Sequence, residues 1–280
     1  MWSDAKSARS TVSYLVTDKE KKEIGNRLIS IKDLTITYSY GDPFYIPSLS
    51  FAKGEITSIL GKNGCGKTTL IRTIAGMLPY RGSIQIEGKE CREYRGAERS
   101  QKISYLPQMI KAVNMDVQTL TEHGRYPWHG NYRRLSKEDK AYVAEALAIT
   151  GMNVFKDRDL TELSGGQLRR AYLSMIIAQN ADIILLDEPT TYMDIESQAL
   201  FYEIAGKLAA KGCGVIMTCH NIEQGFSYSD QIVIMEDRHV KQTGTPIELA
   251  KEKESFREIF GAAVKESEDA DSLYPYVLIK

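Results

Sequence analysis

Residues 61–68, Gly-Lys-Asn-Gly-Cys-Gly-Lys-Thr, have the composition and spacing of a phosphate-binding loop. They fit the pattern G-x-x-x-x-G-K-[ST], with an apolar run before them and a helical pattern after them. The glycines allow successive backbone N–H groups to surround phosphate oxygens at a helix N-terminus, where the helix dipole favours negative charge. In such a loop Lys67 reaches the β- and γ-phosphates and Thr68 binds a magnesium ion. A glycine-rich turn without function explains neither the spacing nor the flanking elements.

Two adjacent carboxylates supply the acidic groups that phosphoryl transfer to water requires. Asp187 and Glu188 follow the apolar run 183–186, which predicts that they lie at the end of a buried strand. Successive residues of a strand point to opposite sides, so the two carboxylates are free to take different roles. We expect Asp187 to hold the magnesium ion and Glu188 to orient or deprotonate the attacking water. Without the phosphate loop, two solvated acids would be the simpler interpretation.

A second helix start of the anion-binding type lies at residues 163–167, Leu-Ser-Gly-Gly-Gln. Ser164 and the glycines after it precede a helical pattern, so backbone N–H groups are exposed at the start of that helix. An ordinary N-cap is the alternative. The phosphate loop upstream and the carboxylates about twenty residues downstream favour the anion-binding role.

The elements that must position these residues predict an α/β fold with a P-loop NTPase core. Runs rich in Ile, Val and Leu alternate with helical patterns, which predicts a parallel sheet covered on both faces. Short β-rich runs from residue 28 predict an antiparallel β region near the N-terminus. Polar and aromatic loops, then a helix capped by Ser136 and Asp139, predict an inserted α-helical subdomain at about residues 115–178.

The core domain is expected to span residues 28–262, between two segments of different character. Residues 1–27 are polar and mixed in charge, and we expect a flexible or partner-dependent extension, or a tag remnant. Residues 263–280 form a C-terminal tail that contains an acidic stretch and then apolar and aromatic residues. The tail either adds a strand at the edge of the core domain or contacts a partner.

Composition disfavours several classes of protein. The 280 residues include 36 Lys and Arg against 37 Asp and Glu, so the net charge of −1 provides no basic field to hold nucleic acid. No apolar run approaches the ~20 residues of a membrane-spanning helix, and the first residues lack a secretory signal, so we expect a chain that stays in the cytoplasm. The four cysteines show no C-x-x-C spacing, so we expect reduced thiols rather than a zinc site or disulfides.

Three further motifs join the phosphate loop, the carboxylates and the second helix start. Together they make about residues 28–260 resemble the ATP-binding cassette (ABC) family. The order of the family's elements is kept: Walker A at 61–69, the Q-loop residue Gln108, the signature at 163–167, Walker B with Glu188, the D-loop ending in Asp194, and the switch residue His220. The resemblance implies a head-to-tail dimer of two copies, in which each ATP lies between the Walker A loop of one chain and the signature of the other.

The resemblance also implies which residues bind ATP and magnesium. The ATP-binding set is then Tyr38, Gly61, Lys62, Asn63, Gly64, Cys65, Gly66, Lys67, Thr68, Thr69, Ser164, Gly165, Gly166, Gln167 and Asp194. The catalytic residues are Glu188, His220 and Gln108, and the Mg²⁺ ligands are Thr68, Gln108 and Asp187. In this scheme Tyr38 stacks on adenine, with Tyr40 as an alternative, although an aromatic residue in a strand can also be there for its β-propensity.

Residues 124–130, Gly-Arg-Tyr-Pro-Trp-His-Gly, resemble a segment of ferric-siderophore importer cassettes, particularly ferrichrome-type ones. Residues 187–195 resemble a D-E-P-T-T-x-x-D-I variant of the same group. The resemblance implies an ATP-hydrolysing subunit at the cytoplasmic face of the cell membrane. It implies separate permease subunits docked near Gln108 and the helical subdomain, and a substrate-binding protein as an indirect partner. An aromatic-rich loop packed on that subdomain is the plainer interpretation of residues 124–130.

Other functions remain as alternatives. Haem or cobalamin import is the nearest one, because the wider group of importers takes those cargoes too. Exporters often fuse the cassette to membrane helices, and non-transport ABC ATPases of DNA repair or translation generally carry paired cassettes or a long coiled-coil insertion. A monomeric P-loop kinase leaves the signature at residues 163–167 unexplained.

Three positions depart from the family's usual residues. Cys65 replaces a small Ala or Ser, which predicts an exposed thiol near the phosphates whose alkylation blocks ATP turnover. Asn221 follows the switch histidine where Asp is frequent, which alters how that histidine is held. Residues 237–239 lack the glycine usual in that hairpin, so the turn type is open.

Overall fold

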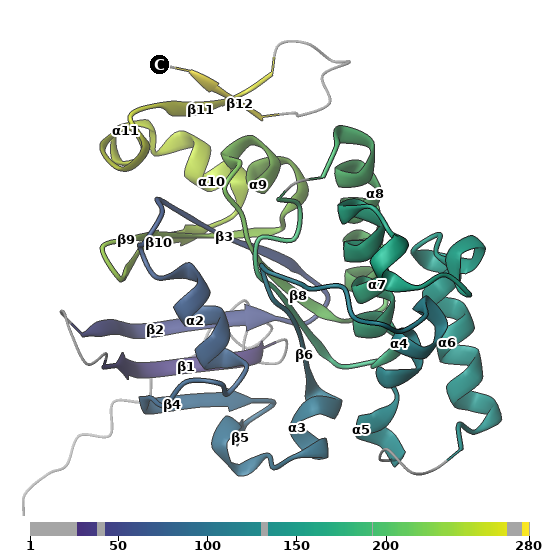
Figure 1. The fold of residues 1–280 in the computed structure, drawn as a ribbon. Coiled ribbons are helices and arrows are strands. Elements are labelled where there is room, and N and C mark those ends of the chain that lie inside the picture. The colour runs from purple at the N-terminus through teal and green to yellow at the C-terminus, as the bar shows by residue number, and fades with distance from the viewer. Residues whose placement is uncertain (1–26, 38–42, 130–133, 192, 268–275, 280) are drawn as a thin grey trace, which may run out of the picture.

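A six-stranded sheet, in the order β10, β9, β3, β8, β7, β6, forms the centre of the computed structural model (Figure 1). The structure describes residues 27–37, 43–129, 134–191, 193–267 and 276–279. The strands of this central sheet are β3 (Ile56–Gly61), β6 (Ile103–Leu106), β7 (Ile183–Leu186), β8 (Gly214–Thr218), β9 (Gln231–Glu236) and β10 (His239–Gly244). All neighbours are parallel except β9 and β10. Every residue of β3, β7 and β8 is buried, because helices or the second sheet cover both faces.

The alternation of side chains along β7 shows how the two faces are covered. Ile183 and Leu185 belong to a core cluster that includes Leu70 and Ile71 of α2 (Lys67–Ile74). Ile184 and Leu186 belong to another cluster, formed with α7 (Gly165–Ala178) and α8 (Ile195–Ala210). The helices that follow the phosphate loop and the signature therefore lie on opposite faces of the central sheet.

A four-stranded antiparallel sheet, in the order β2, β1, β4, β5, covers the α2 side of the core (Figure 1). Its strands are β1 (Arg27–Ile36), β2 (Phe44–Ala52), β4 (Arg81–Ile86) and β5 (Lys89–Glu90), and α3 (Ala97–Lys102) leads from it into β6. Ile29, Phe44 and Ile84 share one core cluster with α2. The expected antiparallel β region is thus a second sheet that packs against α2 and the central sheet.

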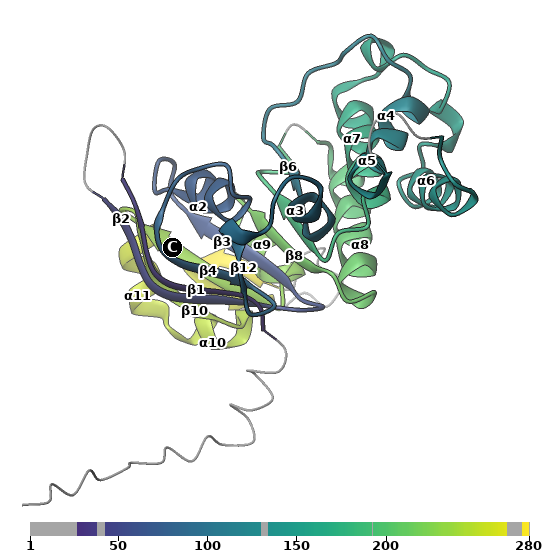
Figure 2. The same cartoon turned by 90° about the horizontal axis from the view of Figure 1, so that it is seen from below.

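The helical part has its own small core. It contains α4 (Val117–His123), α5 (Tyr126–His129), α6 (Lys137–Ile149) and the side of α7 that packs against them. Val117, Leu120, Leu147 and Ala171 belong to this cluster. Figure 2 shows these helices gathered on one side of the molecule, away from β1 and β2. As the sequence predicts, Ser136 and Asp139 form a capping box at the start of α6.

Arg125 connects three helices of this part through buried bonds. Its Nε donates to Asp139 Oδ1 at 2.9 Å, and its Nη1 donates to the carbonyl of Ala178 at 2.8 Å. Burial favours the neutral form of Asp139, but hydrogen bonds from Ser136 and Arg125 outweigh it and hold the pKa of that carboxyl at about 2. Trp128 Nε1 donates to the carbonyl of Gln179 at 2.7 Å. Residues 124–129 therefore pack on the helical part of the fold, as the plainer interpretation of this segment predicts.

The C-terminal helices cover one end of the central sheet. They are α9 (Ile222–Tyr228), α10 (Pro246–Lys251) and α11 (Lys253–Phe260). Phe226 and Phe256 meet edge to face, with ring centroids 5.5 Å apart. β11 (Ala263–Glu266) and β12 (Tyr276–Ile279) form a separate antiparallel pair, so β12 extends neither larger sheet. Within the described ranges, every helix is too short or too polar to cross a bilayer.

Gly124, the C-cap of α4, lies close against the backbone of α7, and this predicts a strong effect of adding one methyl group. A Cβ built on Gly124 would lie 2.3 Å from the carbonyl oxygen of Met175, a backbone atom. We expect Gly124→Ala to lower the free energy of unfolding by about 1–3 kcal/mol, the usual cost of overpacking.

Gly206 provides the matched control, because it lies inside α8 and a Cβ there would meet nothing within 4 Å. Gly206→Ala should raise stability by about 0.5–1 kcal/mol, the usual gain in helix propensity. Urea unfolding followed by circular dichroism measures both. Equal stability of the Gly124 variant and wild type would contradict the close packing of α4 on α7.

Candidate functional site

The parallel strands bring the sequence-predicted residues to one edge of the central sheet. β6 and β7 pair Leu106 with Leu186, and β7 and β8 pair Leu186 with Met217. The carboxyl ends of these strands therefore lie side by side, next to the end of β3 at Gly61. Ligands of open α/β sheets bind at this edge. Chain segments far apart in the sequence thus supply one site.

The phosphate loop is held by the hairpin between β9 and β10. A Cβ on Gly61 would lie 2.2 Å from the carbonyl oxygen of Met235, so only glycine fits there. The N–H of Arg238 donates to the carbonyl of Cys65 at 3.1 Å. Asp237 and Arg238 both have positive φ, 45° and 66°, as the central residues of a type I′ turn do. The hairpin that lacks the usual glycine is therefore a two-residue turn that contacts the loop.

Lys67 and Thr68, at the end of this loop, contact its own backbone and Asp187, respectively. Lys67 Nζ donates to the carbonyls of Gly61 at 2.7 Å and Lys62 at 3.2 Å. Thr68 Oγ1 donates to Asp187 Oδ1 at 3.0 Å. Asp187 is only 1% exposed, so its charge needs these donors. A threonine hydroxyl beside a carboxylate is an oxygen donor set of the kind that magnesium takes together with substrate phosphates, so these two residues fit the ion.

Two further hydroxyl groups fix the orientation of Asp187. Thr218 Oγ1 donates to Oδ1 at 2.9 Å, and Tyr105 OH lies 3.5 Å from Oδ2. Burial first, and then the charge of Asp187, raise the pKa of Tyr105 to about 12. The phenol therefore keeps its proton and remains a donor to the carboxylate at neutral pH.

Glu188, Gln108 and His220 also meet. Gln108 Nε2 donates to Glu188 Oε2 at 2.5 Å, and His220 Nε2 lies 2.5 Å from Glu188 Oε1. Glu188 has a φ of 48°, unusual for a residue with a side chain, and its N–H donates to Thr218 Oγ1 at 2.8 Å. Its carboxylate lines a cleft of about 350 Å³ together with Thr191 and His220. Asp187 and Glu188 thus take separate partners, as the alternation of a strand predicts.

The signature and D-loop residues do not join this cluster within one chain. Ser164 caps α7: its Oγ accepts from the N–H of Gln167 at 3.3 Å, while Gln167 Oε1 accepts from the N–H of Ser164 at 2.9 Å. Asp194 caps α8 in the same way, and the hydrogen bond from the N–H of Ser197 lowers its pKa. The ordinary N-cap interpretation therefore describes what Ser164 does within the chain. α7 and α2 pack on opposite faces of the sheet (Figure 1), so the two helix starts are separate features of the chain.

The remaining predicted residues lie outside the described ranges or away from the two carboxylates. Tyr38 and Tyr40 lie outside the described residues, so the adenine contact stays a prediction. Lys62 and Asn63 are exposed at the tip of the phosphate loop. Asn221 caps α9, accepting from the N–H of Gln224 at 3.0 Å, which is a role that Asp or Asn fills equally well.

The expectation of an exposed thiol at Cys65 is wrong. Cys65 is 5% exposed, and its sulfur packs toward Gly61 inside the loop. Burial raises the pKa of the Cys65 thiol despite the nearby positive charge of Lys67. The side chain is packed within the loop, next to Gly61.

Sequence reasoning missed Arg169 and Thr218. Arg169 Nη1 donates to the carbonyl of Glu188 at 2.7 Å, and Nη2 donates to the carbonyl of Gln108 at 2.5 Å. Thr218 Oγ1 donates to the carboxylate of Asp187 and accepts from the backbone N–H of Glu188. The sequence held only weak signals for the two missed residues. Arg169 is a charged residue at a position where the helical spacing of α7 places buried side chains, and Thr218 is a threonine two residues before His220.

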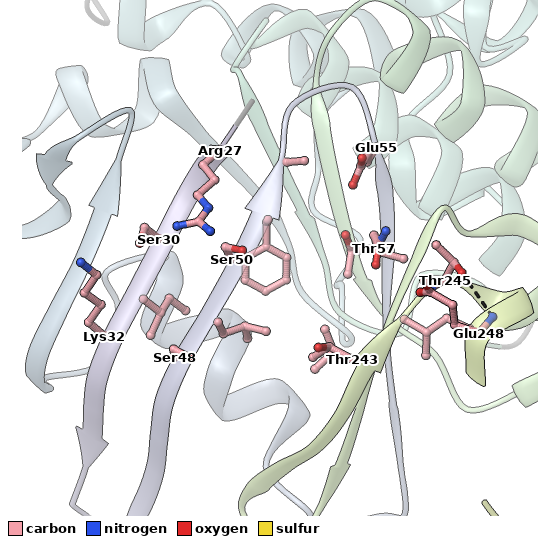
Figure 3. Close-up of a pocket in the computed structure, with 17 residues that line it drawn as sticks. Arg27, Ser30, Lys32, Ser48, Ser50, Glu55, Thr57, Thr243, Thr245 and Glu248 are labelled. Carbon is pink, nitrogen blue, oxygen red and sulfur yellow. Dashed lines mark hydrogen bonds between the residues drawn. The ribbon is translucent and has the colours of Figure 1, made fainter. Parts of the chain in front are cut away.

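A larger cavity, of about 1200 Å³, lies elsewhere (Figure 3). It is lined by β1 and β2 on one side and by β9 and β10 on the other, with Arg27, Ser50, Thr57 and Thr243 among its residues. Thr57 is the second residue of β3, whereas Gly61 is the last, so the cavity opens near the opposite edge of the central sheet. Its described lining includes none of the predicted site residues.

The fold and the site define a P-loop ATPase with a second helix start, capped by Ser164, that is separate from its phosphate loop. The sequence profile of the ABC transporter family matches residues 46–191. The chain belongs to the ABC transporter family. Its activity is accordingly that of the ATP-binding subunits of this family, which hydrolyse ATP.

Individual relatives and one solved structure are similar over most of their length. The petrobactin import ATP-binding protein FpuD of Bacillus anthracis is 37% identical over 223 residues, covering 78% of this chain and 82% of the relative. A probable siderophore transport system ATP-binding protein, YusV of Bacillus subtilis, is 36% identical over 79% of this chain and 82% of the relative. A metal-chelate type ABC transporter in an inward-facing conformation superposes with a TM-score of 0.77 at 22% identity, covering 91% of this chain and 98% of that chain. The last similarity shows the fold alone.

The Thr218 hydroxyl links the Asp187 carboxylate to the backbone N–H of Glu188, and this predicts the effect of removing it. Thr218→Val keeps the shape of the side chain but leaves the N–H of Glu188 without its acceptor and removes one of the donors to Asp187 Oδ1 in a buried site. We expect the free energy of unfolding to fall by about 1–3 kcal/mol and ATP turnover to fall with it. Chemical denaturation and steady-state phosphate release measure the two effects.

Thr161→Val is the matched control, because the Thr161 hydroxyl donates to Asp159 at an exposed position. Its effect on stability should stay within about 0.5 kcal/mol of wild type. Equal effects of the two substitutions would show that the bonds from Thr218 to Asp187 and to the N–H of Glu188 do not stabilise the site.

The burial of Cys65 predicts slow alkylation of the native protein. A raised pKa lowers the thiolate fraction at neutral pH, and the low exposure restricts access of the reagent. With iodoacetamide at pH 7.5, Cys65 should react at least about tenfold more slowly than the half-buried Cys213, and its rate should rise with pH. Peptide mass spectrometry over time measures both rates, and fast, ATP-protected labelling of Cys65 would contradict the burial.

Proposed function

We propose that this chain is the ATP-hydrolysing subunit of an importer for a ferric siderophore or a related iron complex. The observation that carries the catalytic part is the contact of Glu188 with both Gln108 and His220, beside the Thr68–Asp187 pair. The two curated relatives named above are ATP-binding proteins of petrobactin import and of a probable siderophore transport system. Their coverage of this chain supports the same class of cargo here.

Hydrolysis follows from the placement of each group. Glu188 accepts a proton from the water that attacks the γ-phosphoryl group in line, and Gln108 and His220 hold that carboxylate in position. Lys67 provides positive charge at the β- and γ-phosphates, where charge develops in the transition state. Thr68 and Asp187 would hold a magnesium ion, which supplies positive charge next to the phosphate oxygens.

A head-to-tail dimer of two copies completes the site. Ser164 and Gly165 are exposed at the start of α7, which packs on the face of the sheet opposite α2. In the dimer, Ser164 of the partner subunit faces the γ-phosphate, so ATP bridges the two chains and hydrolysis removes the bridge. Asp194, exposed at the start of α8, lies at the same interface.

Permease subunits would dock where apolar side chains are exposed near Gln108. Met109 is 80% exposed, and Val113 and Trp128 are also exposed, beside the helical part of the fold. An apolar surface of this kind marks a contact with another protein. The chain is thereby a peripheral protein at the cytoplasmic face of the cell membrane, and a substrate-binding protein acts on the other side through the permease.

Uptake of labelled cargo by cells that lack this chain tests the proposal. We expect wild type to restore uptake of a ferric siderophore, but not of haem or cobalamin. Glu188→Gln should restore none, because ATP turnover falls by about 10²–10⁴-fold without the proton acceptor. Glu203→Gln, an exposed carboxylate on α8 that pairs with Lys207, is the matched control and should behave as wild type.

The other outcomes are equally informative. If wild type restores uptake of haem or cobalamin alone, the proposed siderophore cargo is wrong, but the role as an importer subunit stands. Restoration by Glu188→Gln would remove this residue from catalysis. With ATP, Glu188→Gln should sediment as a dimer, and a persistent monomer would contradict the head-to-tail arrangement.

A further inference from the structure

Gln108 and Glu188 occupy equivalent positions on two paired strands. β6 and β7 are parallel and pair Leu106 with Leu186, and each of the two residues lies two positions beyond its strand. Their side chains meet through the bond from Gln108 Nε2 to Glu188 Oε2. The distance between the two backbones at this point therefore decides whether the amide holds the carboxylate.

One guanidinium group spans these two backbones. Arg169 donates from Nη1 to the carbonyl of Glu188 at 2.7 Å and from Nη2 to the carbonyl of Gln108 at 2.5 Å. Arginine is suited to this task because its planar fork offers several donors in fixed directions. Arg169 is 6% exposed, and a buried charge is costly unless hydrogen bonds satisfy it. A neutral apolar residue at this position would avoid that cost but would leave the two carbonyls unconnected.

The helix that carries Arg169 is the one that begins at the signature. Ser164 is the N-cap of α7, and Arg169 lies five residues later, about 7–8 Å along the helix axis. Arg169, Leu173 and Ile176 are buried on one face of α7, and Leu173 and Ile176 pack in the cluster that contains Leu186 of β7. A movement of the first turn of α7 is thereby passed on to Arg169.

We propose that Arg169 is a positioning residue that couples the signature end of α7 to Glu188 and Gln108 of the same chain. The inference rests on the proposed dimer, in which that end of α7 meets the ATP held by the partner. Binding of ATP at one interface then sets the carboxylate of the other interface. Arg169 acts on the site through the backbone carbonyls of Glu188 and Gln108.

Substitution of Arg169 tests this role. Arg169→Met keeps the length of the side chain and removes the donors, and we expect kcat to fall by about 10–100-fold, as misplacement of a catalytic group does. The Kd for Mg-ADP should stay within about twofold of wild type, because α2, the helix that follows the phosphate loop, packs on the face of the sheet opposite α7. The Hill coefficient for ATP should fall towards 1. Arg169→Lys, which reaches one carbonyl, should recover part of kcat.

Arg158→Met is the matched control, because Arg158 is exposed and stacks on Phe155 in the helical part of the fold. It should leave kcat, the Hill coefficient and the ADP Kd unchanged. An Arg169→Met variant with wild-type kcat and Hill coefficient overturns the proposal. Parallel losses of the unfolding midpoint, the ADP affinity and kcat, with no recovery by lysine, also overturn it, because they show a merely structural role.

Failure of the proposed dimer is separable from failure of this inference. A wild-type Hill coefficient of 1, with Glu188→Gln monomeric in ATP, contradicts the dimer and with it the coupling between interfaces. In that case the ratio of the kcat change to the ADP Kd change still decides whether Arg169 positions Glu188 within one chain.

Discussion

The parallel pairing of β6, β7 and β8 is the constraint on which the site depends. Their register places Gln108, Glu188 and Thr218 at one edge of the sheet, although they lie 30 to 110 residues apart in the sequence. The strands hold this register because β7 and β8 are apolar and buried along their whole length. A slip of one residue would turn the apolar side chains of β7 to the wrong helices and would separate the carboxylates from their donors.

Glu188 shows how the surrounding structure maintains an unfavourable local conformation. A residue with a side chain at positive φ costs about 1–3 kcal/mol. Two buried bonds to its backbone offset that cost: the N–H donates to Thr218 Oγ1, and the carbonyl accepts from Arg169. Bonds of this kind contribute about 0.5–1.5 kcal/mol each, or more when one partner is charged. The turn that directs the carboxylate into the cleft therefore depends on side chains from β8 and α7.

The sequence predicted the local motifs of the site better than the contacts between segments that are far apart in the chain. The phosphate loop, the strand before Asp187 and the capping box of Ser136 and Asp139 are all encoded within a few residues, so the sequence identified them. Arg169 gave no comparable signal, because its role depends on two carbonyls 61 and 19 residues away. Cys65 was predicted wrongly for a similar reason: its burial comes from packing inside the loop and from the hairpin at Asp237 and Arg238.

Two different supports hold the two halves of the site, and this has a mechanical consequence. The phosphate loop is held by Met235 and Arg238 of the β9–β10 hairpin, in the core that includes α2. Glu188 and Gln108 are held by Arg169 of α7, in the core on the opposite face of the sheet. Packed cores shift as units rather than deform continuously. Rotation of α7 relative to the sheet can therefore change the position of the carboxylate while the phosphate loop keeps its shape, which separates nucleotide binding from hydrolysis within one domain.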